Sequence, residues 1–354
     1  MRKFGYLLLW AWIKTALWMY FTKIRIRGIG QVPNNKPLLF LANHQNALLD
    51  ALLVATHSPR KIYFLTRSDV FKNPILKMFF NYLQMIPIYR IRDGKEALKY
   101  NEAIFQRCSK LLQRGEAILI FPEGNHSLKR KVRPLSKGFT RFLFAALDDN
   151  PQLDVRLVPI GINYKKAAVF PDKVTVCYGT DIQLLNYYDK DAIIDSVNSL
   201  KRVVHQELTT LTTHIDDEKE YDDIVSYLKV NGIDFLDPEV ANKMVSSYAL
   251  NSKPVDLEGN RWSKVYSVGK VLFNIINLPI FLIWTKVIKP KVGELEFLST
   301  VRFMVFLLFY PIFYLLLALI LTYVLSYTWA LFVLVVHMLL NLIWVKLLAP
   351  VFSK

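Results

Sequence analysis

Residues 303–345 contain no charged side chain, and this run limits the possible folds of the chain more than any other feature. A transmembrane helix needs about 20 mainly apolar residues, so the run is long enough to cross a bilayer twice. Ser326-Tyr327-Thr328 offers a turn near its middle, and aromatic residues that favour the membrane–water interface stand beside that turn and near the far end. We therefore predict a two-helix transmembrane hairpin over about residues 303–345.

Basic residues flank this hairpin on one side of the membrane. Arg302 and Lys346 stand at its two ends, and two spans return the chain to the side that it left. Lysine and arginine are enriched in cytoplasmic segments, so we expect the rest of the chain on the cytoplasmic face. His337 and Asn341 lie four apart on one face of the second span. They form either an intramembrane site or, as we favour, a hydrogen bond between the two helices.

A shorter apolar stretch, residues 271–285, precedes the hairpin within a membrane region that we place at residues 263–354. Pro279 interrupts the stretch, and Lys270 and Lys286 flank it. It is short for a span, so we expect a re-entrant or interfacial helix. A full third span would reverse the predicted topology.

Residues 1–22 are apolar and aromatic, but Lys14 stands near their middle. A lysine at the centre of a transmembrane helix costs about 2.5–3.5 kcal/mol, which disfavours a span. A signal peptide is disfavoured too, because no small-residue cleavage site is present. The tryptophan and tyrosine side chains, with Arg2 and Lys3, predict a helix lying in the headgroup region of a membrane. A core helix is the alternative.

The net charge of +16, from 45 basic and 29 acidic residues, indicates an anionic partner such as nucleic acid, a membrane surface or a phosphorylated substrate. Hydrophobic residues make up 53% of the chain, which favours the membrane. No aromatic-basic RNA-binding motif is present, so we expect no nucleic-acid partner. Cys108 and Cys177 lack the spacing of a zinc site or a disulfide framework, and we expect both to be reduced in packed structure.

Residues 23–188 alternate short apolar runs with amphipathic stretches. This alternation predicts an α/β domain, a mixed sheet flanked by helices with a ligand cleft at the strand ends. The first strand alternates basic and apolar residues, which is typical of a half-buried edge strand. The expected strands are residues 23–27, 38–41, 61–65, 85–92, 117–121, 157–162 and 174–178, and the expected helices are residues 47–56, 71–83 and 95–113.

Residues 189–262 are predicted to form a helical appendage and a linker. Apolar residues from Ile193 to Leu211, spaced by three and four, indicate one face of a long helix within residues 190–230. We interpret His205, next to that face, as structural. The acidic run at residues 216–223 is expected to be a solvated loop or helix end rather than a metal site.

A histidine follows the predicted strand at residues 38–41, in the polar turn Asn43-His44. The helix expected over residues 47–56 comes next, with Asn46 as its N-cap. A histidine in such a turn can face a cleft, and Asp50 in the next helical turn can hold its ring in one tautomer. The alternative is a core histidine beside a surface aspartate.

Four stretches of this domain, taken in order, resemble the sequence blocks of the glycerolipid acyltransferase superfamily, which includes lysophosphatidate and glycerol-3-phosphate acyltransferases. They cover about residues 37–164, and their order and spacing make the resemblance specific. The family's third block is usually FPEGTRS. The matching stretches are Asn43-His44 with Asp50, IPIYR at residues 86–90, FPEGNHS at residues 121–127 and VPIG at residues 158–161.

The resemblance implies a membrane-bound O-acyltransferase of phospholipid biosynthesis. It would move a fatty acyl group from acyl-CoA or acyl-carrier protein to glycerol-3-phosphate or a lysophospholipid, with no metal or other cofactor. His44 would be the base and Asp50 its orienting partner, without a covalent acyl-enzyme. The implied acceptor-binding residues are Arg90, which can grip a phosphate bidentately, and Glu123, Gly124, Asn125, Ser127 and Lys137. An amino-acid lipid as acceptor, or a non-catalytic basic membrane-anchored protein, are the alternatives.

Two features depart from the family pattern. Five residues separate His44 from Asp50 where the family usually has four. Neither spacing puts both on one helix face, so the histidine must precede the helix. Asn125-His126 replaces Thr-Arg, which removes a fixed cation. The following basic residues either replace that charge or form a solvated face: Lys129, Arg130, Lys131, Arg133 and Lys137.

Overall fold

The computed structural model describes residues 2–71, 78, 80, 82–89, 94, 96–251 and 263–349. At its centre lies an eight-stranded sheet in the order β1-β7-β6-β2-β5-β3-β4, with β8 paired to β6 off this path. The strands are β1 Lys23–Arg27, β2 Leu38–Ala42, β3 Ile62–Arg67, β4 Met85–Ile88, β5 Ala117–Ile120, β6 Arg156–Tyr164, β7 Lys173–Tyr178 and β8 Ile182–Gln183.

The sheet is mixed, as the sequence predicts. β6 pairs antiparallel with β7 and β8, and the other neighbours are parallel. β1 lies at one edge as expected, where Arg25 and Arg27 form ion pairs with Asp234 and Asp237 at 3.4 and 3.0 Å. The central strand β2 is buried along its whole length, which explains its unbroken apolar sequence.

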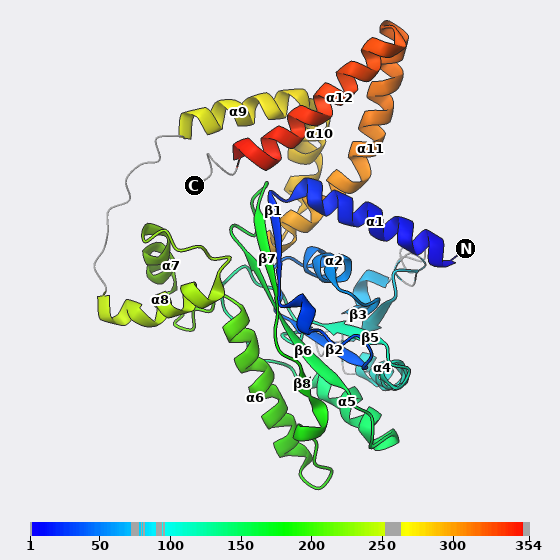
Figure 1. Ribbon diagram of the computed structural model, residues 1–354, viewed down its shortest axis with the longest axis vertical. Coiled ribbons are helices and arrows are strands. Elements are labelled where there is room, and N and C mark those ends of the chain that lie inside the picture. Colours follow the sequence, from blue (N-terminus) through cyan, green and yellow to red (C-terminus); the bar gives the residue numbers. More distant parts are fainter. Residues whose placement is uncertain are drawn as a thin grey trace.

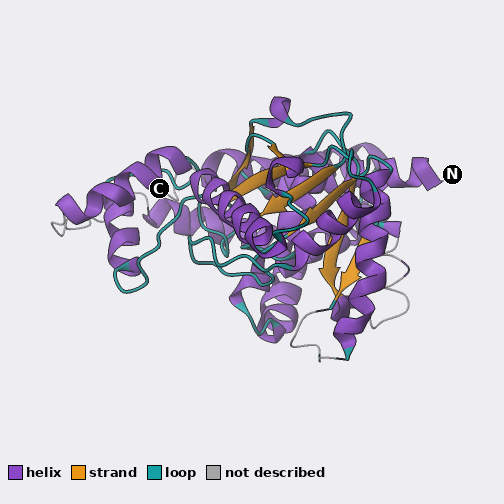
Figure 2. Ribbon diagram, turned by 90° about the horizontal axis from the view of Figure 1, so that it is seen from below, coloured by secondary structure: helices purple, strands orange, loops and turns teal. Residues whose placement is uncertain are grey.

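Helices cover both faces of the sheet, as Figures 1 and 2 show. Alternate residues of β2 point into two cores, with Leu38 and Phe40 in one and Leu39 and Leu41 in the other. The first core is closed by α1, α2 and the start of α11 (Leu298–Val324), and the second by α4, α5 and α6. The helices of the domain and its appendage are α1 Arg2–Tyr20, α2 Leu48–His57, α4 Asn101–Gln113, α5 Gly138–Asp149, α6 Ile193–Leu211, α7 Tyr221–Val230 and α8 Pro238–Asn251.

Several element predictions need correction. The long helix predicted from the apolar residues between Ile193 and Leu211 is confirmed as α6, and a second helix, α7, follows it after residues 212–220. Helix α5 and strand β8 were not predicted, although apolar residues at 139, 142, 143 and 146 have the spacing of a buried helix face. β4 ends at Ile88, and Arg90 with most of residues 71–83 lies outside the described part of the chain. Cys108 and Cys177 are buried free thiols, as predicted.

The glycine of the fourth block has a packing role. Gly161 lies in β6 where the C-terminal end of α6 crosses the sheet. A Cβ atom at this position would come within 2.0 Å of the Leu211 carbonyl oxygen. Only glycine therefore lets α6 approach β6 this closely.

The N-terminal helix α1 is packed on one face and exposed on another. Ile13, Leu17 and Tyr20 belong to the first core, together with Phe303 of α11. Trp12 and Trp18 are among the apolar side chains that stay exposed. The helix lies between the sheet and the C-terminal hairpin (Figure 1). It thus combines a core face with an exposed apolar face, and its place at a membrane surface stays a prediction.

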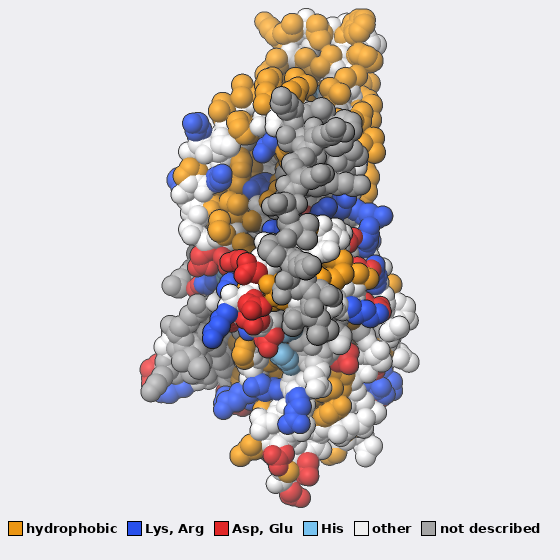
Figure 3. Space-filling model, turned by 90° about the vertical axis from the view of Figure 1, so that its left-hand side faces the viewer, with side chains coloured by type: hydrophobic (Ala, Val, Ile, Leu, Met, Phe, Trp, Pro, Cys, Tyr) orange, Lys and Arg blue, Asp and Glu red, His pale blue; other side chains and the backbone are white. Residues whose placement is uncertain are grey.

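The C-terminal region contains the predicted hairpin of α11, Leu298–Val324, and α12, Tyr327–Ile343. Helical segments Leu295–Val324 and Tyr327–Leu348 are long and apolar enough to cross a membrane. The hairpin projects away from the sheet, and apolar side chains cover that end of the molecule (Figures 1 and 3). The turn falls at residues 325–326, beside the predicted one.

The stretch before the hairpin is bent. Segments Tyr266–Ile276 and Leu278–Lys291 meet at 101°, which makes them either a broken span or a re-entrant loop. They include α9 Ser263–Ile276 and α10 Leu278–Leu282, and the break falls at Asn277, just before Pro279. A full straight span is thus excluded for this stretch, in line with the predicted interruption.

Hydrogen bonds join this bent pair to the hairpin. His337 shares a 3.0 Å hydrogen bond with the Tyr314 hydroxyl, and Asn341 donates to the same oxygen at 3.2 Å. The favoured interpretation of His337 and Asn341 as an interhelical contact is therefore confirmed. The contact extends further, because the Asn277 amide donates to Asn341 at 2.6 Å and His337 Nε2 lies 2.9 Å from the Ile276 carbonyl oxygen.

Candidate active site

The motif residues meet at the carboxyl ends of three adjacent parallel strands, β5, β2 and β6. His44 follows β2, the third block at residues 121–127 follows β5, and Tyr164 ends β6. The register places Leu41 beside Ile120 and Ala42 beside Ile160, so β5 and β2 end at nearly one level and β6 continues beyond them to Tyr164. Ligands of open α/β sheets bind at this edge.

Asp50 is the most constrained group of the site. Its side chain is fully buried, and Oδ2 lies 2.8 Å from His44 Nδ1. The same oxygen accepts the backbone N–H groups of Gln45 and Asn46, each at 2.8 Å. Oδ1 accepts the Tyr164 hydroxyl at 2.6 Å. Four donors therefore fix the carboxylate in one position and compensate for its burial.

The predicted N-cap is wrong. The helix begins one residue later, with Ala47 at the N-cap position and no side-chain capping bond. The Asn46 side chain instead donates to the Ala167 carbonyl oxygen at 3.0 Å, and Asp50 accepts the amides at the helix start. A carboxylate in the first helical turn is also favoured by the helix dipole. Asp50 thus orients the histidine and caps the turn at once.

Ala47 accommodates the unusual spacing of the motif. Its φ of 44° and ψ of −122° belong to a region that L residues rarely adopt. This bend directs the chain from His44 into α2, so that His44 precedes the helix as the sequence predicts. The five-residue gap between His44 and Asp50 is therefore compatible with a direct contact.

The geometry defines the state of the His44 ring. A carboxylate only accepts hydrogen bonds, so Nδ1 carries a proton and Nε2 is the nitrogen available to take one. The ring stacks on Phe121, with 3.9 Å between centroids and 12° between planes. The side chain remains 16% exposed. His44 is thus an oriented base whose side chain is partly open to solvent.

The third block forms a turn that Arg133 holds together. The Glu123 side chain is 2% exposed, and its Oε2 lies 2.6 Å from the Arg133 guanidinium. Arg133 also donates to the carbonyl oxygens of Asn125 and His126. Ser127 N–H donates to the His44 carbonyl oxygen at 3.0 Å, which joins the two motif turns.

The predicted acceptor-binding residues occupy different environments. Gly124, with a φ of 71°, and Asn125 are exposed at the tip of the turn. Ser127 Oγ accepts the Lys129 amide at 3.3 Å. Lys137 is exposed at the N-cap of α5, one residue after Ser136, whose amide bonds to Pro122. Arg90 lies outside the described residues, so its phosphate contact stays a prediction.

The basic residues after the third block mostly face the appendage. Arg130 donates to the Lys165 carbonyl oxygen at 2.8 Å and packs its guanidinium 3.9 Å from the centre of the Phe235 ring. Lys131 pairs with Asp216 and with Glu218 of the acidic run. These two cations thus help to hold the appendage on the domain, and Arg133 is the one that reaches the third block.

Sequence reasoning missed the contribution of the C-terminal region to the site. His126 Nε2 lies 3.0 Å from Glu294 Oε2, and its ring centroid is 5.7 Å from that of His44. In the first turn of α11, Thr300 Oγ1 donates to the Asn46 carbonyl oxygen at 2.6 Å and accepts the Leu49 amide at 3.2 Å. The start of the membrane hairpin is therefore bonded to the turn that carries His44.

Thr300→Val tests this connection. Valine keeps the shape of the side chain but removes the two hydrogen bonds of the Thr300 hydroxyl, which are together worth about 1–3 kcal/mol, while the Leu49 amide keeps its 3.0 Å bond to the Asn46 carbonyl oxygen. We expect a lower free energy of unfolding by that amount and faster hydrogen exchange of the Leu49 amide. Thr322→Val is the matched control, because Thr322 is exposed on the same helix and bonds to its own carbonyls. Equal effects of both changes would contradict the connection.

Burial raises the pKa of Glu123 to about 7, against the lowering effect of Arg133. A carboxyl with a raised folded pKa binds its proton more tightly in the folded state, so its contribution to stability falls as pH rises from about 4.5 to about 7. We expect Glu123→Gln to remove up to about 1.4 kcal/mol per pH unit from this fall, the value for one proton.

Urea unfolding in detergent at several pH values measures this difference. Asp172, whose pKa burial also raises to about 7, adds a fall of the same sign, so Asp172→Asn serves as the comparison. If the free energy of unfolding of Glu123→Gln falls with pH as steeply as that of the unmodified protein, Glu123 binds its proton equally in the folded and unfolded states.

Part of the α/β domain matches a known protein family in sequence. A sequence model of the family described as Acyltransferase matches residues 23–163. This range contains the β1 to β6 part of the sheet and the motif turns around His44 and Glu123. The blocks noted in the sequence and the family match therefore coincide.

Two curated relatives are 1-acyl-sn-glycerol-3-phosphate acyltransferases. The chloroplastic protein of Brassica napus is 24% identical over 210 residues, which is 56% of this chain and 57% of that one. The Chlamydomonas reinhardtii protein is 30% identical over 177 residues, 48% of each chain. This chain thus spans about half the length of these relatives.

A crystal structure of the 1-acyl-sn-glycerophosphate acyltransferase PlsC from Thermotoga maritima is also similar. It has a TM-score of 0.42 and 19% identity, over 58% of this chain and 80% of that chain. Residues 23–163 are thus similar to the family described as Acyltransferase, and two curated relatives of the chain are 1-acyl-sn-glycerol-3-phosphate acyltransferases.

Proposed function

We propose that the protein transfers a fatty acyl group from a thioester to the hydroxyl group of a glycerophosphate or lysophospholipid. The observation that carries this proposal is the oriented pair of His44 and Asp50 at the strand ends, with Nδ1 held by the carboxylate and Nε2 as the nitrogen that can take a proton. Acyl-CoA or acyl-carrier protein is the donor. The family match and the names of the relatives support the reaction class.

The reaction follows from the roles of these two residues. His44 Nε2 takes the proton of the acceptor hydroxyl while its oxygen attacks the thioester carbonyl carbon. Asp50 holds the ring and stabilises the imidazolium that forms. The carbon–sulfur bond breaks as the tetrahedral intermediate collapses, and the imidazolium returns its proton to the leaving thiolate. The proton balance closes within one cycle, without a covalent acyl-enzyme.

A lipid acceptor fits the position of the site. α11, which is long and apolar enough to cross a membrane, bonds through Thr300 to Asn46, two residues after His44. The catalytic turn therefore lies where the hairpin leaves the domain. We place this turn at the cytoplasmic surface of the membrane, as the flanking Arg302 and Lys346 predict.

The test is a screen of the purified full chain against a long-chain acyl-CoA, with release of free thiol as the measurement. The acceptors are glycerol-3-phosphate, lysophosphatidate, another lysophospholipid and a lyso-amino-acid lipid. We expect release with glycerol-3-phosphate or lysophosphatidate. Release with only the amino-acid lipid would show that the acceptor belongs to that class instead. No release of thiol with any acceptor, from acyl-CoA or from acyl-carrier protein, would contradict catalysis and favour a non-catalytic binding protein.

A further inference from the structure

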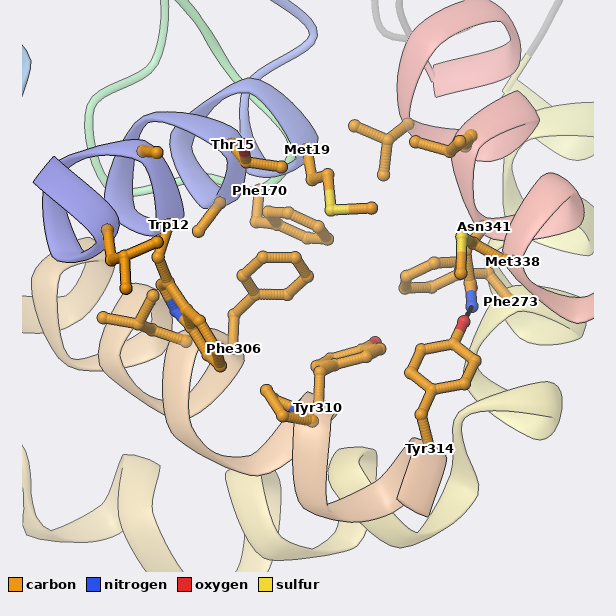
Figure 4. Close-up of a pocket in the computed structure, with 17 residues that line it drawn as sticks. Trp12, Thr15, Met19, Phe170, Phe273, Phe306, Tyr310, Tyr314, Met338 and Asn341 are labelled. Carbon is orange, nitrogen blue, oxygen red and sulfur yellow. Dashed lines mark hydrogen bonds between the residues drawn. The ribbon is translucent and has the colours of Figure 1, made fainter. Parts of the chain in front are cut away.

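A cavity of about 470 Å³ lies among α1, the bent pair, α11 and α12, apart from the His44 site. Its volume falls within the range of about 300–1,000 Å³ that is common for ligand pockets. Trp12, Phe306, Tyr310 and Met338 surround one common space (Figure 4). Most of the other lining side chains are also apolar or aromatic. The cavity is therefore large enough for a ligand and suited to an apolar one.

The main polar groups in the wall are already bonded to protein partners. Asn341 donates to the Tyr314 hydroxyl at 3.2 Å, and Tyr310 donates to Asn277 at 3.1 Å. A stable water would need two to four polar partners of its own. These bonds leave an apolar interior, which selects a hydrocarbon over a polar ligand.

The position of the cavity identifies the hydrocarbon. Its walls include α11 and α12, the two segments able to cross a membrane, and α1, whose exposed side carries Trp12. Acyl chains are the apolar component of the bilayer at this level. Tyr20 and Phe303, 1% and 0% exposed, pack against each other between the cavity wall and the catalytic turn. Neither His44 nor a residue of the third block is among the described residues that line the cavity, which favours a lipid of the bilayer over a reacting acyl chain.

We propose that this cavity binds one acyl chain of a bilayer glycerolipid as a structural ligand. Such a chain fills the space between α1 and the hairpin, where side chains alone leave a gap. The proposal stands independently of acyl transfer, since it concerns a different part of the molecule.

Contacts connect an occupied cavity to the catalytic turn. The Tyr20 ring lies 4.8 Å from Phe170 and 6.2 Å from Phe306, which both line the cavity. Its hydroxyl donates to the Ser299 carbonyl oxygen at 3.3 Å. Ser299 in turn donates to the Ala167 carbonyl oxygen, the same oxygen that Asn46 binds. An acyl chain against Phe170 and Phe306 therefore supports the segment that positions His44.

Photo-crosslinking tests the proposal on the full chain. The protein is placed in nanodiscs of phosphatidylcholine that contain a small fraction of phosphatidylcholine with a diazirine in the acyl chain. We expect crosslinks at Met19, Tyr310 and Met338 inside the cavity. Ala11→Phe and Thr15→Phe, two substitutions on the exposed side of α1 that fill the cavity, are expected to abolish them.

Leu7→Phe is the matched control, because Leu7 is 59% exposed on the same helix and does not line the cavity. It should keep all the crosslinks. Crosslinks confined to outward residues such as Leu315, or equal labelling at Met338 in every variant, would overturn the proposal. Displacement by lysophosphatidate or oleoyl-CoA would assign the cavity to a substrate instead and overturn the structural role. His44→Ala should retain the crosslinks, which separates this result from any failure of catalysis.

Discussion

Replacing His44 by alanine is expected to lower the rate of acyl transfer by about 10²–10⁴-fold, the usual contribution of a general base. The protein should stay folded, because Asp50 keeps the Gln45 and Asn46 amides and the Tyr164 hydroxyl as donors. Loss of the ring stacked on Phe121 costs stability only modestly, on the order of 1 kcal/mol. Thiol release with a saturating acceptor measures the rate.

His205→Ala is the control for this change. His205 lies on α6 and faces the His214 ring at 6.2 Å, on the side of the sheet away from α2. Its replacement should leave the rate near that of the unmodified protein, in keeping with the structural role assigned to it. A His44→Ala enzyme with nearly full activity would remove His44 from the mechanism and leave the family match without its expected base.

Asp50→Asn is expected to reduce kcat by about 10²–10⁴-fold with little change in KM. The analogous exchange in a Ser-His-Asp triad costs about 10⁴-fold because the histidine takes the wrong tautomer, and a neutral amide also does not stabilise the imidazolium. Asparagine is a suitable mimic at this position, since its side-chain oxygen can take the place of Oδ2 with its three N–H donors. The amide nitrogen then faces Tyr164, whose oxygen can accept. Asp50 is fully buried, so the acceptor does not touch it.

Tyr164→Phe tests whether Asp50 acts through its charge or through its position. Burial and the nearby Asp50 carboxylate raise the pKa of Tyr164 well above its ordinary value, so the hydroxyl keeps its proton and donates it. Phenylalanine removes that single donor, which costs about 1–3 kcal/mol in stability but leaves the charge of Asp50. We expect kcat to fall less than in Asp50→Asn. Equal losses in the two variants would show that orientation, rather than charge, is the contribution of Asp50.

The sequence predicted the parts of the site that depend on local order. Each motif turn follows a buried strand, and parallel strands bring their carboxyl ends to one edge, so His44 and the third block had to meet. The requirement that His44 precede the helix also followed from its spacing to Asp50. The bend at Ala47 did not, because alanine carries no signal for the φ of 44° that it adopts.

Contacts between distant segments were not predictable in the same way. Thr300 bonds to a residue 254 positions earlier, and one threonine in an apolar helix has many ordinary roles. The sequence did not show which of the five basic residues after the third block takes the place of the arginine that the family has at the position of His126. The orientation of these residues depends on how the appendage packs. Arg130 and Lys131 turn toward that appendage, whereas Arg133 turns to Glu123. Only the folded arrangement distinguishes them.

The bond between Thr300 and the turn after His44 has a consequence for how the protein is made. All eight strands of the sheet are synthesised before α11, so a nascent chain can assemble them while the support of its catalytic turn is still missing. Phe303, which is fully buried in the first core, arrives equally late. Docking of the hairpin therefore completes the contacts that support the turn after His44. A chain whose hairpin has not yet folded onto the sheet lacks part of the support of the turn that carries His44.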